Sequence, residues 1–214
     1  MAHLELVHVA EDESRRPRPD HDVIAQLIDE NASVLEIGCA GGALIQKLQR
    51  ERGARVRGLE RDKVKVRQCV GKGLSVVQGD ALEDLAAFPS ATFKYVVFSK
   101  SLQTVERPRE ALRQAARIGE RIIVSIDNFA YWRARLRLLY TGRAPLRQRG
   151  EQSWADHDAL RPCSIRDFAE LARDMRLGIE TAVPLTSGRV GGAFAKTLWR
   201  SNWFAEEAVF LLAP

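Results

Sequence analysis

A glycine-rich turn between an apolar run and a helical stretch constrains this chain more than any other feature. Residues 34–37 predict a buried strand, 38–42 a tight loop and 43–52 a helix. Glycine is needed where the chain turns sharply and a ligand approaches the backbone, and the first N–H groups of the following helix remain available to that ligand. The segment therefore predicts a loop that holds a nucleotide-like ligand.

Acidic residues end the next two apolar runs. Glu60 follows the run 56–59 and lies about 20 residues after the glycine-rich loop, where ribose-binding acids are expected. Asp80 ends the run 74–79. Ligands of open α/β sheets bind at the carboxyl ends of the strands, so side chains at these ends should meet. The residues expected to meet there, and to bind an adenosine-containing ligand, are Gly38, Glu60, Asp80 and Ser99.

Two cofactors compete for this loop, and the sequence favours S-adenosylmethionine over NAD. A dinucleotide fold requires G-x-G-x-x-G, but Ala40 and Ala43 stand at the second and third glycine positions. Glu36 places an acid inside the apolar strand, which suits a ligand with a cationic ammonium and sulfonium better than one with a pyrophosphate. An ordinary strand-to-helix turn without a ligand is the remaining alternative.

Composition limits the class of protein. The chain has 214 residues, of which 45% are hydrophobic, and this suits one α/β domain with a complete core. No apolar run is long enough to cross a bilayer and no secretory signal is evident, so we expect a cytoplasmic location without membrane contact. Cys39, Cys69 and Cys163 lack C-x-x-C spacing, so we expect reduced thiols and neither a disulfide framework nor a metal site. Cys39 is interpreted as a small residue packed in the tight loop.

Apolar runs and helical patterns alternate through much of the chain. Residues 1–20 are charged and interrupted by prolines, so we expect a mobile segment there and a single domain over residues 21–214. Strand–helix alternation implies right-handed crossovers and a parallel sheet covered on both faces. The predicted strands are 33–37, 55–59, 74–78, 93–98 and 121–126, and the predicted helices are 43–52, 62–71 and 107–117, with a short helix beginning near His21.

An arginine-rich helix is predicted over residues 132–139. Trp132, Leu136 and Leu139 fall on one helical face, so we expect an amphipathic helix whose arginines are solvated. With a net charge of +5, contact with an acidic protein or an anionic substrate is the alternative to a merely solvated face. Nucleic acid is disfavoured because no RNA-binding signature accompanies the charge.

The C-terminal part is irregular at first and regular at its end. Residues 141–162 show no apolar period, so the region 129–162 is expected to be a lid or binding insertion. Ser164 is expected to cap a helix. Two strands, 178–186 and 203–212, are expected to form an antiparallel pair at the sheet edge.

These residues resemble the class I S-adenosylmethionine-dependent methyltransferases, and more closely the methionine-biosynthesis MetW family, from about His21 to the C-terminus. The first two segments below occur in many methyltransferases, and the others are more particular to MetW-like chains. The segments that carry the resemblance are Val34-Leu35-Glu36-Ile37-Gly38-Cys39, Val77-Gln78-Gly79-Asp80, Ser101-Leu102-Gln103, Asn128-Phe129, Trp132-Arg133, Arg135-Leu136, Gly142-Arg143, Arg166-Asp167-Phe168 and Phe204-Ala205-Glu206-Glu207-Ala208-Val209-Phe210.

The resemblance implies a Rossmann-like fold with a mostly parallel, seven-stranded sheet and an antiparallel C-terminal edge hairpin. It also implies a protein of methionine biosynthesis that works with homoserine O-acyltransferase and acts on a small-molecule acceptor that the sequence does not identify. The alternative is a non-catalytic subunit that binds S-adenosylmethionine and regulates the acyltransferase. RNA methylation is a weaker alternative, and fold alone does not establish methyl transfer.

The chain departs from the family pattern at several positions. Ala40 stands where the family's loop usually has glycine, and Lys94 where it has aspartate. Lys100 replaces a glutamine, Asp127 replaces a proline, and the segment 153–161 has lost most of the family's tyrosine-rich, histidine-containing pattern. The cofactor half is thus retained better than the half expected to bind an acceptor or partner, which is compatible with a changed role.

If S-adenosylmethionine binds, residues 38–42 are expected to hold its methionine portion, Glu60 its ribose hydroxyls and Asp80 its adenine amino group. The residues expected to bind the cofactor are Glu36, Gly38, Cys39, Ala40, Gly42, Glu60, Arg61, Asp80, Ala81 and Ser99. Candidates for contact with a substrate or partner are Gln103, Asn128, Arg133, Arg137 and His157. His157 is the best base by residue type, but methyl transfer depends mainly on positioning and no catalytic residue is assigned. The Asn/Asp-Pro-Pro-aromatic motif is missing after strand 93–98, which disfavours adenine and glutamine N-methylation.

Overall fold

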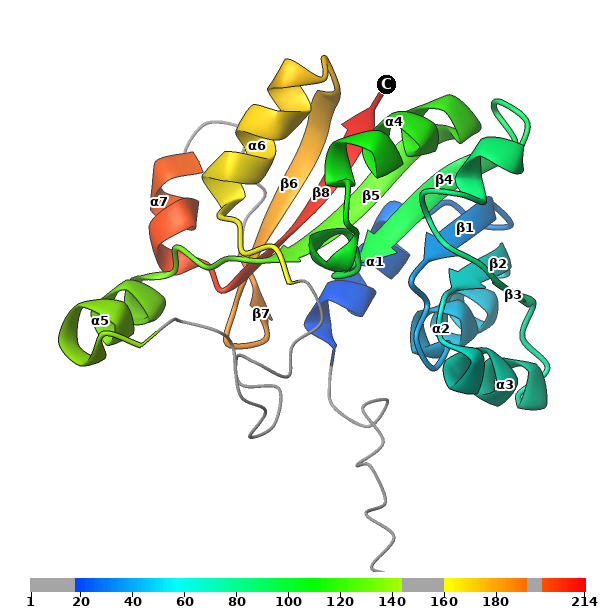
Figure 1. The fold of residues 1–214 in the computed structure, drawn as a ribbon, viewed down its shortest axis with the longest axis horizontal. Helices are drawn as coiled ribbons and strands as arrows, with labels where there is room; N and C mark the ends of the chain where they lie inside the picture. The colour runs from blue at the N-terminus through cyan, green and yellow to red at the C-terminus, as the bar shows by residue number, and fades with distance from the viewer. Residues whose placement is uncertain (1–17, 144–159, 192–197) are drawn as a thin grey trace, which may run out of the picture.

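Strands and helices alternate along the N-terminal part of the chain, as the sequence predicts (Figure 1). The computed structural model describes residues 18–143, 160–191 and 198–214. The strands are β1 (Ser33–Ile37), β2 (Arg55–Glu60), β3 (Val76–Gln78), β4 (Phe93–Ser99), β5 (Gly119–Asp127), β6 (Gly178–Thr186), β7 (Arg189–Val190) and β8 (Glu207–Ala213). The helices are α1 (Pro19–Leu27), α2 (Ala43–Arg52), α3 (Lys63–Gly71), α4 (Pro108–Ile118), α5 (Trp132–Thr141), α6 (Ile165–Asp174) and α7 (Leu198–Phe204), with 3-10 turns η2 (Leu85–Ala87) and η3 (Leu102–Thr104).

The strands form one sheet in the order β3-β2-β1-β4-β5-β8-β6-β7. Strands β1 to β5 pair in parallel, whereas β8 lies antiparallel between β5 and β6. The expected Rossmann-like sheet with an antiparallel C-terminal edge is confirmed, but it has eight strands rather than seven. The additional strand is β7, which has two residues and folds back onto β6.

The last predicted strand begins later than expected. Residues 198–204 form α7, and β8 starts only at Glu207. Trp203 and Phe204 are apolar and therefore resemble the strand residues that follow, but the Ala205 N–H donates to the Ser201 carbonyl at 2.9 Å and continues the helical turn. The buried run begins with β8, whose first six residues are all buried.

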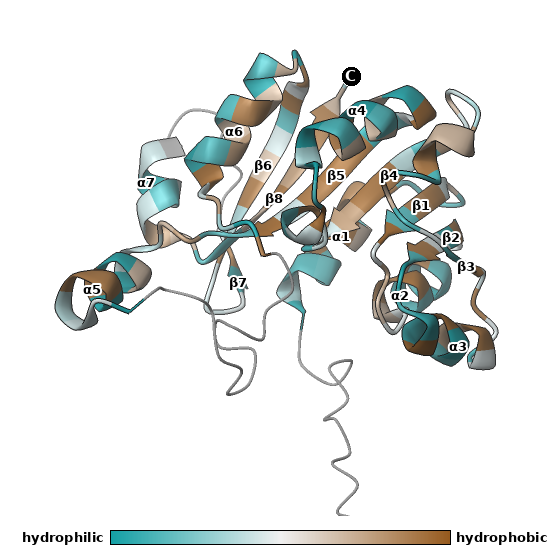
Figure 2. Ribbon diagram, in the orientation of Figure 1, coloured by the Kyte–Doolittle hydropathy of each residue, from teal (hydrophilic) through white to brown (hydrophobic). Residues whose placement is uncertain are grey.

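Alternate residues of the central strands supply two hydrophobic layers. Leu35 of β1 packs with residues of α4 and α6 on one face, and Val34 packs with residues of α1 and α2 on the other. This alternation is what a parallel sheet covered on both faces requires. Figure 2 shows the apolar strands between these helices. Truncating a fully buried side chain such as Leu48 or Leu112 to alanine would lower the free energy of unfolding by about 2 to 5 kcal/mol.

Helix α5 forms as predicted but does not join either layer. None of its residues is buried, and Leu139 and Tyr140 are 74% and 79% exposed. The helix follows β5 and extends beyond the sheet (Figures 1 and 2). Its apolar face therefore lies outside the core, although the expected amphipathic pattern is present.

Two boundaries of the fold bear on the site. Helix α1 begins at Pro19 and Asp20 is fully buried, so the end of the segment expected to be mobile overlaps the first helix. Helix α6 begins with the expected serine cap, because Ser164 and Asp167 form a capping box. No helix in the described ranges combines the length and apolarity needed to cross a bilayer.

Candidate cofactor site

The glycine-rich loop closes tightly over the end of β1. Gly38 has φ +71°, and a Cβ atom there would lie 2.6 Å from the Cβ atom of Ser101. Gly42 has φ +77°, and its Cβ would lie 2.4 Å from Leu74. Both positions therefore require glycine, because a side chain would be strained and would clash. The loop presents its backbone where α2 begins, as a ligand-binding turn requires.

Ala40 adopts the same left-handed conformation without being glycine. Its φ is +46°, which strains the backbone of an L-residue by about 1 to 2 kcal/mol. Its N–H donates to Oε2 of Glu60 at 2.8 Å, and its carbonyl accepts from the Cys69 thiol at 3.3 Å. These two bonds hold Ala40 in place at the position where the family usually has glycine.

Glu60 joins the loop to the end of β2. Its second carboxylate oxygen, Oε1, accepts from the Asp62 N–H at 3.0 Å, and the residue is 8% exposed. Each carboxylate oxygen accepts more than one hydrogen bond. Glu60 therefore faces the glycine-rich loop and retains acceptor capacity for further donors. Its contact with ribose hydroxyls stays a prediction.

Glu36 is an acid buried inside β1. It is 2% exposed, and among the described residues its Oε2 atom has no hydrogen-bond partner. Burial raises the pKa of this carboxyl to about 8, despite the opposing charge of Arg18. A buried acid that lacks a partner is unfavourable unless a cation or donor reaches it. Its position therefore suits a cationic ligand.

Asp80 and Ala81 follow β3 beside this edge. The Gly79 N–H donates to the Glu60 carbonyl at 3.0 Å, which brings the ends of β2 and β3 together. The Asp80 carboxylate accepts from the Leu82 N–H at 2.7 Å, and Ala81 packs against the hydrophobic layer next to α4. Asp80 is therefore near Glu60, but its carboxylate is partly used in its own turn.

The remaining loop residues have structural surroundings. Cys39 is 3% exposed, and burial raises the pKa of its thiol, so it packs as the small residue that we expected. Arg61 is exposed at the start of the turn into α3. The three cysteines are free, and in the ranges 18–143, 160–191 and 198–214 no cluster of side chains suits a metal ion.

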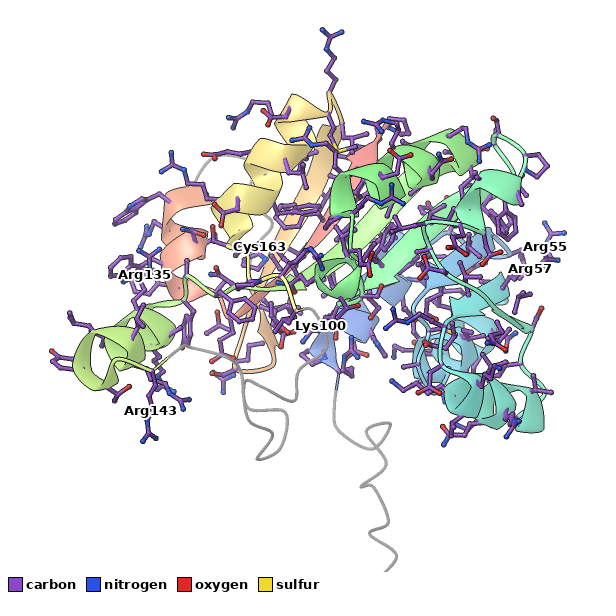
Figure 3. All side chains as sticks on the ribbon, viewed as in Figure 1. Arg55, Arg57, Lys100, Arg135, Arg143 and Cys163 are labelled. Atoms are coloured by element: carbon purple, nitrogen blue, oxygen red, sulfur yellow. The ribbon has the colours of Figure 1, made fainter. Side chains whose placement is uncertain are left out.

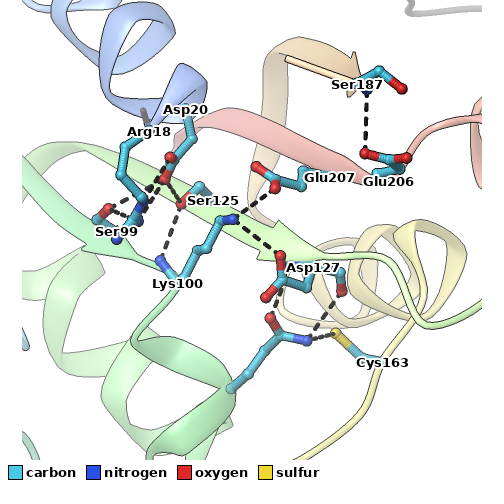
Figure 4. A network of polar contacts seen from close by, with 11 residues as sticks. Arg18, Asp20, Ser99, Lys100, Ser125, Asp127, Cys163, Ser187, Glu206 and Glu207 are labelled. Carbon is cyan, nitrogen blue, oxygen red and sulfur yellow. Dashed lines mark hydrogen bonds and ion pairs between the residues drawn. The ribbon is translucent and has the colours of Figure 1, made fainter. Parts of the chain in front are cut away.

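Ser99, at the end of β4, forms hydrogen bonds with residues at the N-terminus of α1. Its hydroxyl accepts from Arg18 at 2.8 Å and donates to Asp20 at 3.3 Å (Figure 4). Asp20 also accepts from the Ser125 hydroxyl at 2.9 Å. Burial by itself would raise the pKa of Asp20, but the bonded guanidinium of Arg18 lowers it below its usual value. The N-terminus of α1 is thus held over the ends of β4 and β5.

Lys100 lies next to this network, between two acids. Its ammonium is 3.0 Å from Asp127 and 2.8 Å from Glu207, and its side chain is 7% exposed (Figure 4). Its backbone has φ +57° and its N–H donates to the Ser125 hydroxyl at 3.0 Å. Two departures from the family pattern, Lys100 and Asp127, are therefore ion-pair partners.

Gln103 and Asn128 are buried amides that bond to the backbone. Gln103 accepts from the Asp127 N–H at 2.9 Å and donates to the Asp127 carbonyl at 3.1 Å. Asn128 donates to the carbonyls of Asn202 and Ala205 at 2.9 and 2.7 Å. These contacts give both residues a role in holding loops together, and their contact with a substrate stays a prediction.

The other substrate or partner candidates are separated from this edge. Arg133 and Arg137 lie on α5, where Arg133 is stacked on Trp132 with 5.3 Å between the guanidinium carbon and the ring centroid. His157 lies outside the described residues. Arg18, Asp20 and Glu207 are functional-site neighbours that the sequence does not single out. For the charged residues around Lys100, the sequence signal is that Lys100 and Asp127 both depart from the family pattern.

The edge formed by β1, β2 and β3 fits an adenosyl cation. Backbone N–H groups and a carboxylate with remaining acceptor capacity meet at the loop. The buried Oε2 atom of Glu36, which has no hydrogen-bond partner among the described residues, lies in the adjoining strand β1. Pyrophosphate does not suit this set, because the carboxylate of Glu60 at the loop would repel it.

Comparison with known proteins identifies the family of this chain. Residues 18–212 match the family described as Methionine biosynthesis protein MetW. The chain belongs to the MetW family. A curated relative in Rhodopirellula baltica, the bifunctional methionine biosynthesis protein MetXA/MetW, is 29% identical over 174 residues. That alignment covers 77% of this MetW chain and 28% of the relative, so the chain spans little more than a quarter of the relative's length.

Solved structures confirm the methyltransferase fold of this MetW chain. An S-adenosylmethionine-dependent methyltransferase from Thermotoga maritima superimposes with a TM-score of 0.68 at 15% identity, covering 91% of this chain and 87% of that one. The [4+2]-cyclase SpnF superimposes with a TM-score of 0.64 at 15% identity, covering 95% and 85%. Both likenesses concern the fold alone, and the second protein is titled for a different reaction.

Proposed function

We propose that this MetW chain binds S-adenosylmethionine at the ends of β1, β2 and β3 and acts in methionine biosynthesis. The observation that carries the proposal is the pairing of Glu60 with the Ala40 N–H, together with the buried Oε2 atom of Glu36, which has no partner in the part of the chain that the structure describes. S-adenosylmethionine presents ribose hydroxyls for Glu60 and a cationic ammonium and sulfonium for Glu36. The family membership supports the same ligand.

Each part of the cofactor has a candidate residue. The loop 38–42 and Glu36 would hold the methionine portion and its ammonium, and Glu60 would accept the ribose hydroxyls. Asp80 would accept from the adenine amino group, with Ala81 against the ring. Bound S-adenosylmethionine would supply an activated methyl group on its sulfonium.

Calorimetry with S-adenosylmethionine and S-adenosylhomocysteine tests this proposal directly. Glu60→Ala should weaken binding by about 10- to 100-fold, because hydrogen bonds to a charged group contribute about 1.5 to 3 kcal/mol. Glu51→Ala is a matched control, since Glu51 is an acid of α2 that pairs with Lys47 away from the loop. No heat of binding with the wild-type chain, or equal affinity in the Glu60 variant, would contradict the proposal.

The first candidate activity is methyl transfer to a small-molecule acceptor. The fold and the proposed cofactor support it, and positioning of the acceptor can supply much of the acceleration without a dedicated base. A broad acceptor screen with labelled cofactor should give a slowly formed methylated product. If no acceptor yields product while the cofactor binds, methyl transfer is excluded for the compounds screened and the second candidate gains weight.

The second candidate is a subunit that binds S-adenosylmethionine and regulates homoserine O-acyltransferase. The relative from Rhodopirellula baltica joins a MetXA part to a MetW part, and we take the MetXA part to be the acyltransferase that the resemblance implies. Mixing the separate chains should change the acyltransferase rate, and S-adenosylmethionine should alter that change. If Arg133 and Arg137 of α5 contribute to docking, reversing both charges should abolish co-purification. An unchanged complex would remove them from the interface.

A further inference from the structure

A groove between α5, α6 and α7 lies at the end of the molecule opposite Arg55 and Arg57 (Figure 3). Its volume is about 370 Å³. The lining residues that matter here are Arg135, Arg166, Glu170, Arg173, Trp199 and Trp203. The groove is therefore built from cationic and aromatic side chains and is separate from the loop that faces Glu60.

The helices beside this groove expose large apolar side chains. Trp199 of α7 is 72% exposed, and on α5 the most exposed apolar side chains are those of Leu139 and Tyr140. A helix of ten residues is marginal unless other residues pack against its apolar face, because isolated helices shorter than about 12 to 15 residues are marginal in water. Large apolar side chains exposed on neighbouring helices are typical of an interaction surface.

The charge of the groove indicates what it binds. Three arginines and one glutamate are among its lining residues, and Glu170 is bonded to Arg166 at 2.8 Å. Arg135 lies over the ring of Trp203, with 4.4 Å between its guanidinium carbon and the ring centroid, so cation and aromatic ring are held together. Tryptophan, tyrosine and arginine are the residue types that dominate binding energy at protein interfaces.

We propose that this groove and the adjoining apolar face of α5 form the surface on which the acyltransferase partner docks, through an acidic surface that carries an apolar anchor. This inference rests on the partner named in the second candidate function and adds where that partner binds. A second copy of the chain fits poorly, because arginines would face arginines across a symmetric contact. Single-stranded RNA would match the arginines and tryptophans but would leave the leucines of α5 uncovered.

Affinity measurements between this chain and purified homoserine O-acyltransferase test the surface. Arg135→Glu combined with Arg173→Glu should weaken binding by about tenfold or more and reduce its dependence on salt. Trp199→Ala should weaken binding by about tenfold or more with little change in salt dependence, as expected for an apolar hot spot. Trp199 is mostly exposed, so this variant should fold normally.

The matched control is Arg55→Glu combined with Arg57→Glu, which changes the net charge by the same amount on exposed residues of β2. This control should retain the wild-type affinity within about threefold, because only long-range steering changes. Calorimetry with S-adenosylmethionine verifies that each variant is folded.

Three outcomes overturn the inference. Wild-type affinity in both groove variants would remove the surface and leave the partner in place. No binding by the wild-type chain would refute the partner, and the surface with it, while cofactor binding is judged separately. Tight, salt-dependent binding of a single-stranded RNA that is lost in the groove variants, with acyltransferase affinity unchanged, would assign the groove to nucleic acid.

Discussion

The two groups of polar residues at the strand ends are held in different ways. At β1, β2 and β3 the carboxylates of Glu60 and Asp80 accept from backbone N–H groups of nearby turns. At β4, β5 and β8 charged side chains from several elements hold one another, with Lys100 between Asp127 and Glu207. Side-chain acceptors that bond only to backbone leave capacity for a ligand. Mutual ion pairs, in contrast, link elements of the fold.

The difference separates residues that are candidates for ligand binding from residues that hold the elements of the fold together. The first group includes Glu36, whose buried oxygen has no partner among the described residues. The second group holds α1 over the sheet through Asp20 and connects β4 to β8 through Lys100. Substitutions in the first group should therefore change cofactor affinity and pH dependence, whereas substitutions in the second should change the free energy of unfolding.

The largest effect is expected at Lys100. Lys100→Met should lower the free energy of unfolding by about 3 to 5 kcal/mol, because it removes the buried cation between the buried carboxylate of Glu207 and the partly buried carboxylate of Asp127. Denaturant titration measures the loss. In a double-mutant cycle with Asp127→Asn, the double variant should lose less than the sum of the single variants. Additive losses would show that the two departures from the family pattern are energetically independent.

The next effect concerns Glu36 and pH. Because burial raises its pKa from 4.5 to about 8 in the folded protein, the folded state favours the protonated form. The free energy of unfolding should therefore fall as pH rises through this window, by on the order of 3 kcal/mol. Glu36→Gln should remove that loss, and unfolding curves of both proteins from pH 5 to 8 measure it. Burial lowers the pKa of His21 to about 4, and this contributes equally to the wild-type protein and the Glu36 variant. If the free energy of unfolding has the same pH dependence in the two proteins, the prediction is wrong.

The same acid should report on the cofactor. If the ammonium of S-adenosylmethionine approaches Glu36, binding at neutral pH should release about one proton, because a neighbouring cation favours the ionised carboxylate. Calorimetry in two buffers with different ionisation enthalpies measures this release. A binding enthalpy that is independent of the buffer would separate Glu36 from the cofactor.

The smallest effect is expected at Ala40. Ala40→Gly should stabilise the protein by less than about 1 kcal/mol, because relief of the left-handed strain exceeds the added entropy of the unfolded chain only slightly. Ala43→Gly is the control, since Ala43 begins α2 and glycine in a helix is unfavourable by up to about 1 kcal/mol. Thermal unfolding compares the two, and a loss of stability in the Ala40 variant would show that its methyl group packs favourably.

The sequence predicted the strand, loop and helix of the candidate cofactor edge because the signals for them are local. The strand, glycine loop and helix around Gly38 follow one another, and Glu60 lies at a spacing that the fold itself sets. The charged group at β4, β5 and β8 carries no such signal, since Asp20 and Ser125 are 105 residues apart. Contacts of that kind depend on the sheet order, which no short pattern encodes.

Two other regions show the same limit. The periodicity of residues 132–139 predicted a helix correctly but does not report whether anything covers its apolar face, and in α5 that face is exposed. The aromatic residues Trp203 and Phe204 predict a strand, because such residues are common in buried strands, but the structure places them in the short helix α7. Hydrogen bonds to Asn128 fix the carbonyls of Asn202 and Ala205, and that amide lies far away in the sequence.

The ion pairs of Lys100 also make its two acidic partners unequal in consequence. Its ammonium lies 2.8 Å from Glu207 and 3.0 Å from Asp127, and Glu207 is the more deeply buried of the two acids. Replacing Asp127 leaves the lysine paired with Glu207, whereas replacing the lysine removes a cation from both acids. Loss of the aspartate should therefore be tolerated better than loss of the lysine.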